Sequence, residues 1–279
     1  MAENRASVYT GGSPQGYPEG VPCWVDAQLP DVDAGRRFYG ELFGWTFEDA
    51  YGGSGSSGGS GSSGGSGGSS GSSGSGGSGG AVWARLDGAV VAGLAPKTDG
   101  RMPTVWTVYF ATPDAQATVR RIRDAGGQVV MDPYPVDGAG TAALASDPEG
   151  AVFGLWQAAA PPGGHPGFGL RHTPGSFAWA QLYARDTAAA NTFYGHLFHD
   201  ALFGPGAEPD FGRAPVGDVF AEFMPPHFLV HFGVEDCAAA VGAVNRLGGR
   251  VQAEPFDASY GTVAVVTDNQ GASFALLQR

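Results

Sequence analysis

Cysteine, basic side chains and long apolar runs are all scarce in this chain. Its two cysteines, Cys23 and Cys237, lie in opposite halves, which excludes a disulfide framework and a CxxC metal motif and fits a reducing cytoplasm. With 15 Lys and Arg against 27 Asp and Glu, the net charge is −12, so neither nucleic acid nor an anionic membrane is an expected partner. No stretch approaches the roughly 18 apolar residues of a membrane-spanning helix.

Residues 1–20 have neither the basic start nor the apolar stretch of a secretory signal, and they predict a flexible polar arm. At 279 residues and 42% hydrophobic side chains, the chain has the length and composition of two globular domains. We therefore expect a cytoplasmic protein whose partner is a small molecule.

An internal repeat is the strongest feature that is present. A Trp-led strand pattern followed by Phe-Tyr-Gly occurs at residues 24–43 and again at residues 179–198. A double glycine and an Asp-led turn follow in both copies, as Gly126-Gly127, Asp147–Phe153, Gly248-Gly249 and Asp268–Phe274. Because these motifs recur in one order, we predict a tandem duplication with domains at 21–157 and 175–279, joined by a linker at 158–174.

One segment falls outside the repeat. Every residue from 52 to 80 is Gly or Ser, and this run accounts for most of the extra length of the first copy. Such a sequence has nothing to bury and behaves as a flexible coil. A natural low-complexity loop would explain it, but the lack of any side chain beyond hydroxyls favours an engineered linker.

Hydrophobic periodicity predicts the elements of each copy. Residues 24–29 alternate as a strand, and a helix follows that Asp31 or Asp33 caps and Gly44 ends. A second helix begins after Asp114. Further strands are expected at residues 90–94, 104–110, 128–131, 141–145 and 152–157. Strand groups separated by helices indicate an α+β fold in which helices cover one face of a sheet.

This order of elements and motifs resembles the vicinal oxygen chelate superfamily, which groups glyoxalases, bleomycin-resistance proteins and extradiol dioxygenases. The resemblance covers residues 21–157 and 175–279. It implies four βαβββ modules in two tandem glyoxalase-like domains, each a cupped mixed sheet with helices on its outer face. It also implies a monomer that holds in one chain the pseudo-dimer that smaller relatives form by dimerising.

The resemblance also implies where a metal would bind. Metal-dependent relatives carry a His or Gln on the first strand of a module and a Glu near the end of its last strand, donors that suit Zn, Fe, Mn or Ni. Aligned on the helix-capping Asp, these positions hold Trp24, Thr107, Trp179 and Leu229 on first strands and Gly93, Gly154, Glu222 and Ala275 on last strands. We therefore expect no cofactor, with a divalent metal at Glu222 and His231 as the alternative.

Aromatic side chains with a few polar anchors are expected to line the two clefts, a composition typical of sites for flat organic molecules. The expected ligand-binding residues are Trp24, Asp26, Thr107, Tyr109, Trp156, Trp179, Gln181, Glu222 and His231. An alternative is that these aromatic side chains only fill the interfaces between modules.

Two classes of function follow. The first is metal-free binding of a small hydrophobic, aromatic metabolite or antibiotic, for sequestration or resistance. The second is catalysis by a lyase, isomerase, cyclase or dioxygenase-like enzyme, in which Asp26, Tyr109 or His231 acts as acid or base, or Glu222 and His231 hold a metal. The second copy keeps Glu222 and gains histidines, so we expect activity there if only one cleft is active.

Overall fold

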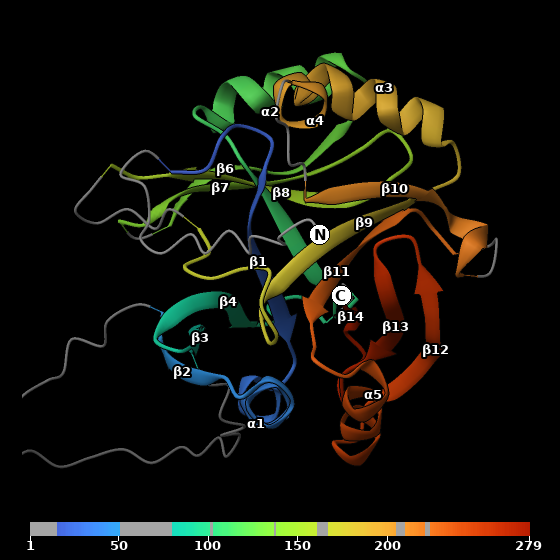
Figure 1. Ribbon diagram of the computed structural model, residues 1–279. Coiled ribbons are helices and arrows are strands. Elements are labelled where there is room, and N and C mark those ends of the chain that lie inside the picture. Colours follow the sequence, from blue (N-terminus) through green and yellow to red (C-terminus); the bar gives the residue numbers. More distant parts are fainter. Residues whose placement is uncertain are drawn as a thin grey trace, which may run out of the picture.

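The computed structural model describes residues 16–50, 80–100, 103–136, 138–160, 167–204, 210–220 and 224–279. Most of the predicted arm, almost all of the Gly/Ser run and part of the predicted linker lie outside these residues. Two mixed β-sheets lie back to back, and the helices gather at two opposite ends of the molecule (Figure 1). No helix of the described residues is long and apolar enough to cross a membrane.

The first sheet holds the first copy, with strand order β2-β3-β4-β1-β5-β8-β7-β6. Its elements are β1 (Pro22–Leu29), α1 (Val32–Phe43), β2 (Thr46–Asp49), β3 (Val82–Leu86), β4 (Ala89–Pro96), β5 (Trp106–Ala111), α2 (Ala115–Asp124), β6 (Gln128–Val136), β7 (Gly140–Ser146) and β8 (Val152–Ala158). At its centre β1 and β5 pair antiparallel, and each lies parallel to the last strand of its own module, β4 or β8. Two βαβββ modules therefore share one sheet, as predicted.

The second sheet holds the second copy, with strand order β10-β9-β11-β14-β13-β12. Its elements are β9 (Phe177–Ala184), α3 (Thr187–Leu197), α4 (His199–Phe203), β10 (Phe211–Pro215), the 3-10 turn η1 (Val216–Asp218), β11 (His227–Gly233), α5 (Cys237–Arg246), β12 (Arg250–Ala258), β13 (Gly261–Thr267) and β14 (Ser273–Gln278).

The third of the four modules differs from its prediction. In its described residues, β9 and the helices lead directly to β10, which pairs parallel with β9 as β4 does with β1. Counterparts of β2 and β3 are missing from this described part, because the segment after α3 continues as α4 and leaves too little chain for two strands. The prediction of four complete βαβββ modules is therefore wrong for the third.

An aspartate starts each of the four longer helices. Asp31, rather than Asp33, caps α1 and accepts a hydrogen bond from the backbone N–H of Ala34 at 2.9 Å. Asp114, Asp186 and Asp236 cap α2, α3 and α5 in the same way. Gly44 ends α1 at φ 73°, a left-handed conformation that glycine adopts without a Cβ clash.

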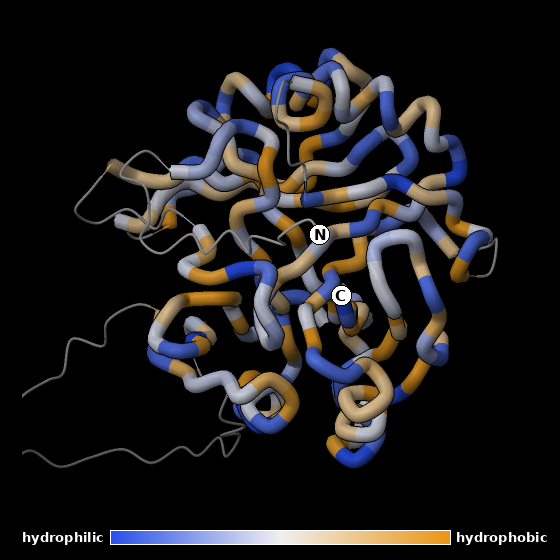
Figure 2. The backbone as a smooth tube through the Cα atoms, viewed as in Figure 1, coloured by the Kyte–Doolittle hydropathy of each residue, from blue (hydrophilic) through white to orange (hydrophobic). Residues whose placement is uncertain are grey.

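One hydrophobic core includes side chains from both copies. The ring of Phe110 on β5 lies 5.1 Å from that of Phe211 on β10, and Trp106 lies 5.0 Å from Phe232 on β11. Figure 2 shows hydrophobic residues along the strands at the centre of the molecule and hydrophilic residues at its outer turns. Contacts such as these fill the space between the sheets, and Trp24, Tyr109 and Trp156 extend the same core to the opposite, concave face of the first sheet.

Buried hydrogen bonds cross between the copies in a reciprocal pattern. Tyr39 on α1 donates its hydroxyl to Oδ2 of Asp268 in the second copy at 2.9 Å. Tyr194 on α3 donates in the same way to Oδ2 of Asp147 in the first copy at 3.2 Å. Burial and the facing carboxylates raise the pKa of both tyrosines, so their hydroxyls stay protonated and remain donors.

Side chains of the two Asp-led turns also form hydrogen bonds with the start of α1 or α3 in the other copy. Gln270 bonds the backbone N–H and carbonyl of Asp31, at 2.8 and 2.9 Å. Glu149 accepts from the backbone N–H groups of Arg185 and Asp186, at 2.8 and 3.1 Å. Each copy therefore completes the helix capping of the other, and the two copies form one interlocked unit.

Replacing Tyr39 by Phe should destabilise the protein by about 1–3 kcal/mol, because Asp268 stays buried without its hydroxyl donor. Tyr194→Phe should have a similar effect, whereas Tyr260→Phe, at a half-buried turn, should change the free energy of unfolding by less than about 0.5 kcal/mol. Urea unfolding followed by circular dichroism measures all three. We expect one transition for both copies, and separate transitions would contradict the interlocked unit.

Candidate functional site

A carboxylate and a phenol meet at the centre of the first sheet. Asp26 on β1 pairs across the strands with Thr107 on β5, and Tyr109 follows two residues later on the same face. The Tyr109 hydroxyl donates to Oδ2 of Asp26 at 3.0 Å. The other oxygen, Oδ1, is buried and has no hydrogen-bond partner among the described residues. One acceptor of this pair is therefore left free on the concave face.

Burial governs the ionisation of Asp26. Desolvation raises the pKa of this carboxyl group to about 7, and the hydrogen bond from Tyr109 only partly opposes the rise. Near neutral pH, Asp26 therefore exists both as an acid that can donate a proton and as a carboxylate that can accept one.

Aromatic rings beside this pair lie against glycines. A Cβ on Gly93 of β4 would lie 3.2 Å from the Trp24 ring, and one on Gly154 of β8 would overlap the ring of Tyr109. Trp24 also lies 6.1 Å from Phe168, which belongs to the segment between the two copies. The rings thus take the space into which a larger last-strand side chain would project.

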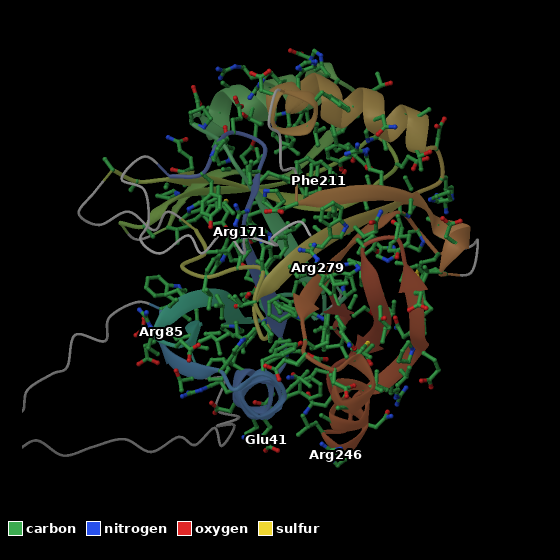
Figure 3. All side chains as sticks on the ribbon, in the orientation of Figure 1. Glu41, Arg85, Arg171, Phe211, Arg246 and Arg279 are labelled. Carbon is green, nitrogen blue, oxygen red and sulfur yellow. The ribbon has the colours of Figure 1, made fainter. Side chains whose placement is uncertain are left out.

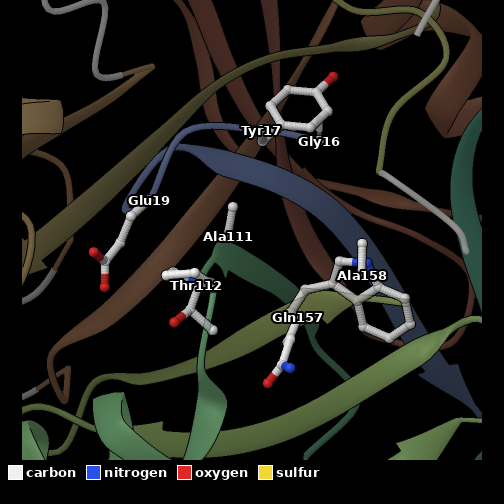
Figure 4. A pocket seen from close by; sticks show the side chains of 9 residues that line it. Gly16, Tyr17, Glu19, Ala111, Thr112, Gln157 and Ala158 are labelled. Carbon is white, nitrogen blue, oxygen red and sulfur yellow. The ribbon is translucent and has the colours of Figure 1, made fainter. Parts of the chain in front are cut away.

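A cavity of about 200 Å³ opens at the ends of β5 and β8 (Figure 4). Its lining includes Trp156, which pairs with Ala111, and Tyr17 and Glu19 of the N-terminal segment. Gln157 contributes a polar side chain, although its amide oxygen already accepts from the backbone N–H of Ala115. Trp156 therefore connects the face that carries Tyr109 with an open cavity.

The second sheet carries a different polar pair in the corresponding places. Gln181 takes the position of Asp26, and His231 takes that of Tyr109, as their strand pairing shows. Gln181 accepts from Nε1 of Trp179 at 3.1 Å instead of bonding across the strands. His231 is fully buried, and its surroundings form a separate hydrophobic cluster that includes Leu229, Val265 and Ala275.

The structure thus sorts the predicted site residues into two faces. The five residues of the first copy, Trp24, Asp26, Thr107, Tyr109 and Trp156, share one concave face, and Trp179, Gln181 and His231 share the other. The alignment of Glu222 with a last strand is wrong: Gly212 on β10 pairs with Gln181 and holds that position. Glu222 itself lies outside the described residues. His227, which follows Pro225 and Pro226, is the first residue of β11.

Two contributing rings were missed from the sequence. Phe168 lies in the segment predicted as a linker, where no periodicity marks it as a packing residue. Tyr260 lies in the hairpin between β12 and β13, and its ring stacks on Trp179 at 5.8 Å. The only sign of this packing in the sequence is the presence of an aromatic residue in a two-residue turn.

Comparison with known proteins agrees with this geometry. The sequence model of the Glyoxalase/Bleomycin resistance protein/Dioxygenase superfamily matches residues 24–155. CFP32 of Mycobacterium tuberculosis, provisionally designated a glyoxylase, is 33% identical over 94% of this chain and 96% of its own length. The chain belongs to this superfamily.

Other relatives and solved structures extend the comparison. The anthracycline biosynthesis protein DnrV of Streptomyces peucetius is 34% identical over 94% of both chains. The Mn(II)-bound glyoxalase of Novosphingobium aromaticivorans has the same fold, with a TM-score of 0.55 at 15% identity over 92% of this chain and 82% of that one. The 2,3-dioxygenase LapB of Pseudomonas sp. KL28 gives a TM-score of 0.52 at 12% identity, over 96% and 94%.

The described last-strand positions of this chain do not fit the metal of such superfamily members. The last-strand positions hold Gly93, Gly154, Gly212 and Ala275, none of which has a donor atom in its side chain. Within the described residues, no group of three or more His, Cys, Asp and Glu side chains is placed to hold an ion. Asp26 and Tyr109 are the hydrogen-bonded ionisable pair on the concave face of the first sheet.

The raised pKa of Asp26 predicts a pH-dependent stability. From about pH 4, near the pKa of Asp in an unfolded chain, to about pH 7, folded Asp26 keeps a proton that the unfolded chain loses, so stability falls as the pH rises. Asp26→Asn removes this dependence. Relative to wild type, the free energy of unfolding of the variant should rise by up to roughly 1.4 kcal/mol per pH unit across this window. Above about pH 7 the difference between the two proteins should stay constant.

Urea unfolding from pH 4 to pH 8 measures this difference, and Asp124→Asn, at an exposed helix end, serves as the control that should stay parallel to wild type. A parallel curve for Asp26→Asn would show that Asp26 titrates as an ordinary exposed carboxyl group.

Proposed function

We propose that the concave face of the first sheet binds a planar aromatic molecule that donates a hydrogen bond to Asp26, without a metal. The observation that carries this proposal is the buried Oδ1 of Asp26, which has no partner while Oδ2 accepts from Tyr109. A buried acceptor left unpaired is unfavourable, so a ligand hydroxyl or amine that reaches it gains binding free energy. Trp24 and Trp156 supply flat apolar surface nearby.

The relatives support this class of ligand. DnrV and DauV are named as anthracycline biosynthesis proteins, and each is 34% identical to this chain over 94% of its length. Anthracyclines contain a planar fused-ring system that carries phenolic hydroxyl groups. An aromatic face with one free acceptor matches that chemistry better than it matches a small aliphatic aldehyde.

A matched pair of planar probes tests the proposal. 2-Hydroxyanthraquinone should bind about 10- to 100-fold more tightly than 2-methoxyanthraquinone, since only the hydroxyl can donate to Asp26. Asp26→Ala should abolish this preference, whereas Asp124→Asn should retain it. Quenching of tryptophan fluorescence reports the binding, with calorimetry as an independent measure. Equal affinities for both probes in the wild-type protein would refute the role of Asp26.

Catalysis at the same pair is a second candidate, and the pKa of Asp26 near 7 favours it. A carboxylate with such a pKa in an apolar setting is suited to general acid–base work near neutral pH. Asp26 would remove or return a proton at a carbon next to a ligand carbonyl, and the Tyr109 hydroxyl would hold the carboxylate in place. Such a step corresponds to an isomerase, lyase or cyclase.

Hydrogen–deuterium exchange tests the catalytic candidate. Wild-type protein in D₂O should accelerate exchange next to the carbonyl of 1-tetralone by about 10²-fold or more over Asp26→Asn, with a rate that rises as the pH passes about 7. Mass spectrometry of the recovered ketone measures the rate. Equal rates for both proteins would exclude proton abstraction by Asp26 and would leave the binding proposal standing.

A further inference from the structure

The second concave face also contains an unused hydrogen-bonding atom. His231 on β11 is fully buried, and its Nδ1 lies 3.1 Å from the carbonyl oxygen of Leu229. A carbonyl oxygen only accepts, so Nδ1 carries the proton and Nε2 is the acceptor of the neutral ring. That Nε2 atom is buried and has no hydrogen-bond partner in the described part of the chain.

The imidazole of His231 stays neutral at physiological pH. Burial lowers its pKa to about 4, and the nearby positive charge of Arg279 acts in the same direction. Arg279, labelled in Figure 3, donates to the backbone carbonyl of Ala178 on β9, the strand that pairs with the β11 strand of His231. Because this neutral acceptor lies close to a fixed positive charge, it should bind a ligand with an uncharged hydrogen-bond donor better than a cationic ligand.

A side chain of the protein itself packs against this imidazole. Tyr260, in the hairpin between β12 and β13, stacks on Trp179 at 5.8 Å and meets His231 edge to face at 6.1 Å. Trp179 in turn lies over Gly212, where a Cβ would approach its ring to 2.8 Å. Tyr260 is therefore placed as a flat ligand would be, with Trp179 on one side and His231 at its edge.

The residue that matches Tyr260 in the first copy is not aromatic. The matching hairpin, between β6 and β7, contains Asp137, Gly138 and Ala139, so the sequence provides no aromatic ring there. Tyr260 is only partly buried and lies in the two-residue turn at the tip of its hairpin. The two copies thus differ at the tip of this hairpin.

We propose that the concave face of the second sheet is a second ligand site, closed by Tyr260, for a neutral planar phenol. The phenol ring takes the place of Tyr260 against Trp179, and its hydroxyl donates to Nε2 of His231. The apolar side chains of Leu229, Val265 and Ala275 form the surrounding surface. This site needs neither Asp26 nor Tyr109, so it stands or falls separately from the function proposed above.

Nitrogen NMR of the histidine side chains tests this directly. In ¹⁵N-labelled full-length protein, 2-naphthol should shift the Nε2 resonance of His231, which is assigned by its loss in His231→Gln. Tyr260→Ala should tighten this binding about five- to tenfold, because the covering ring no longer competes. Tyr260→Phe keeps the ring and serves as the matched control, with unchanged affinity. Asp26→Ala should leave the His231 response intact.

Two results would overturn the proposal. One is an unchanged His231 Nε2 resonance in both the wild-type protein and Tyr260→Ala at saturating 2-naphthol. The other is an equal response to 2-methoxynaphthalene, which has the same ring system but no donor. A His231 response to 2-naphthol alone, strengthened in Tyr260→Ala, supports it.

Discussion

Tyr39 meets Asp268, and Tyr194 meets Asp147, across the boundary between the copies, and the rest of the structure depends on these buried hydrogen bonds. They attach the first helix of each copy to the last turn of the other. With both helices fixed in this way, the convex faces of the sheets pack into one shared core. The concave faces are thereby directed outward, away from the partner copy.

Duplication has left two concave faces with different chemistry. The first has a carboxylate held by Tyr109, beside an open cavity. The second has a neutral imidazole beside Tyr260. In both, a Trp ring lies against the glycine at the last-strand position, Trp24 against Gly93 and Trp179 against Gly212.

Much of the fold could be predicted from the sequence, because local chemistry specified it. Asp31 and Gly44 mark the ends of α1, and the alternation along β1 places Trp24 and Asp26 on one face. The third module could not be predicted, since the motif after α3 does not show that β10 follows within a few residues. That error displaced Glu222 onto a position that Gly212 holds.

By itself, the sequence determined the duplication, the α+β class, the helix caps and the faces of the first strands, because each depends on neighbours along the chain. Only the tertiary structure decided that Asp26 bonds Tyr109, that His231 keeps a free acceptor, and that Tyr260 packs against its imidazole. Those contacts join residues distant in sequence, and burial, which sets the pKa of Asp26 and His231, is a property of the packed molecule.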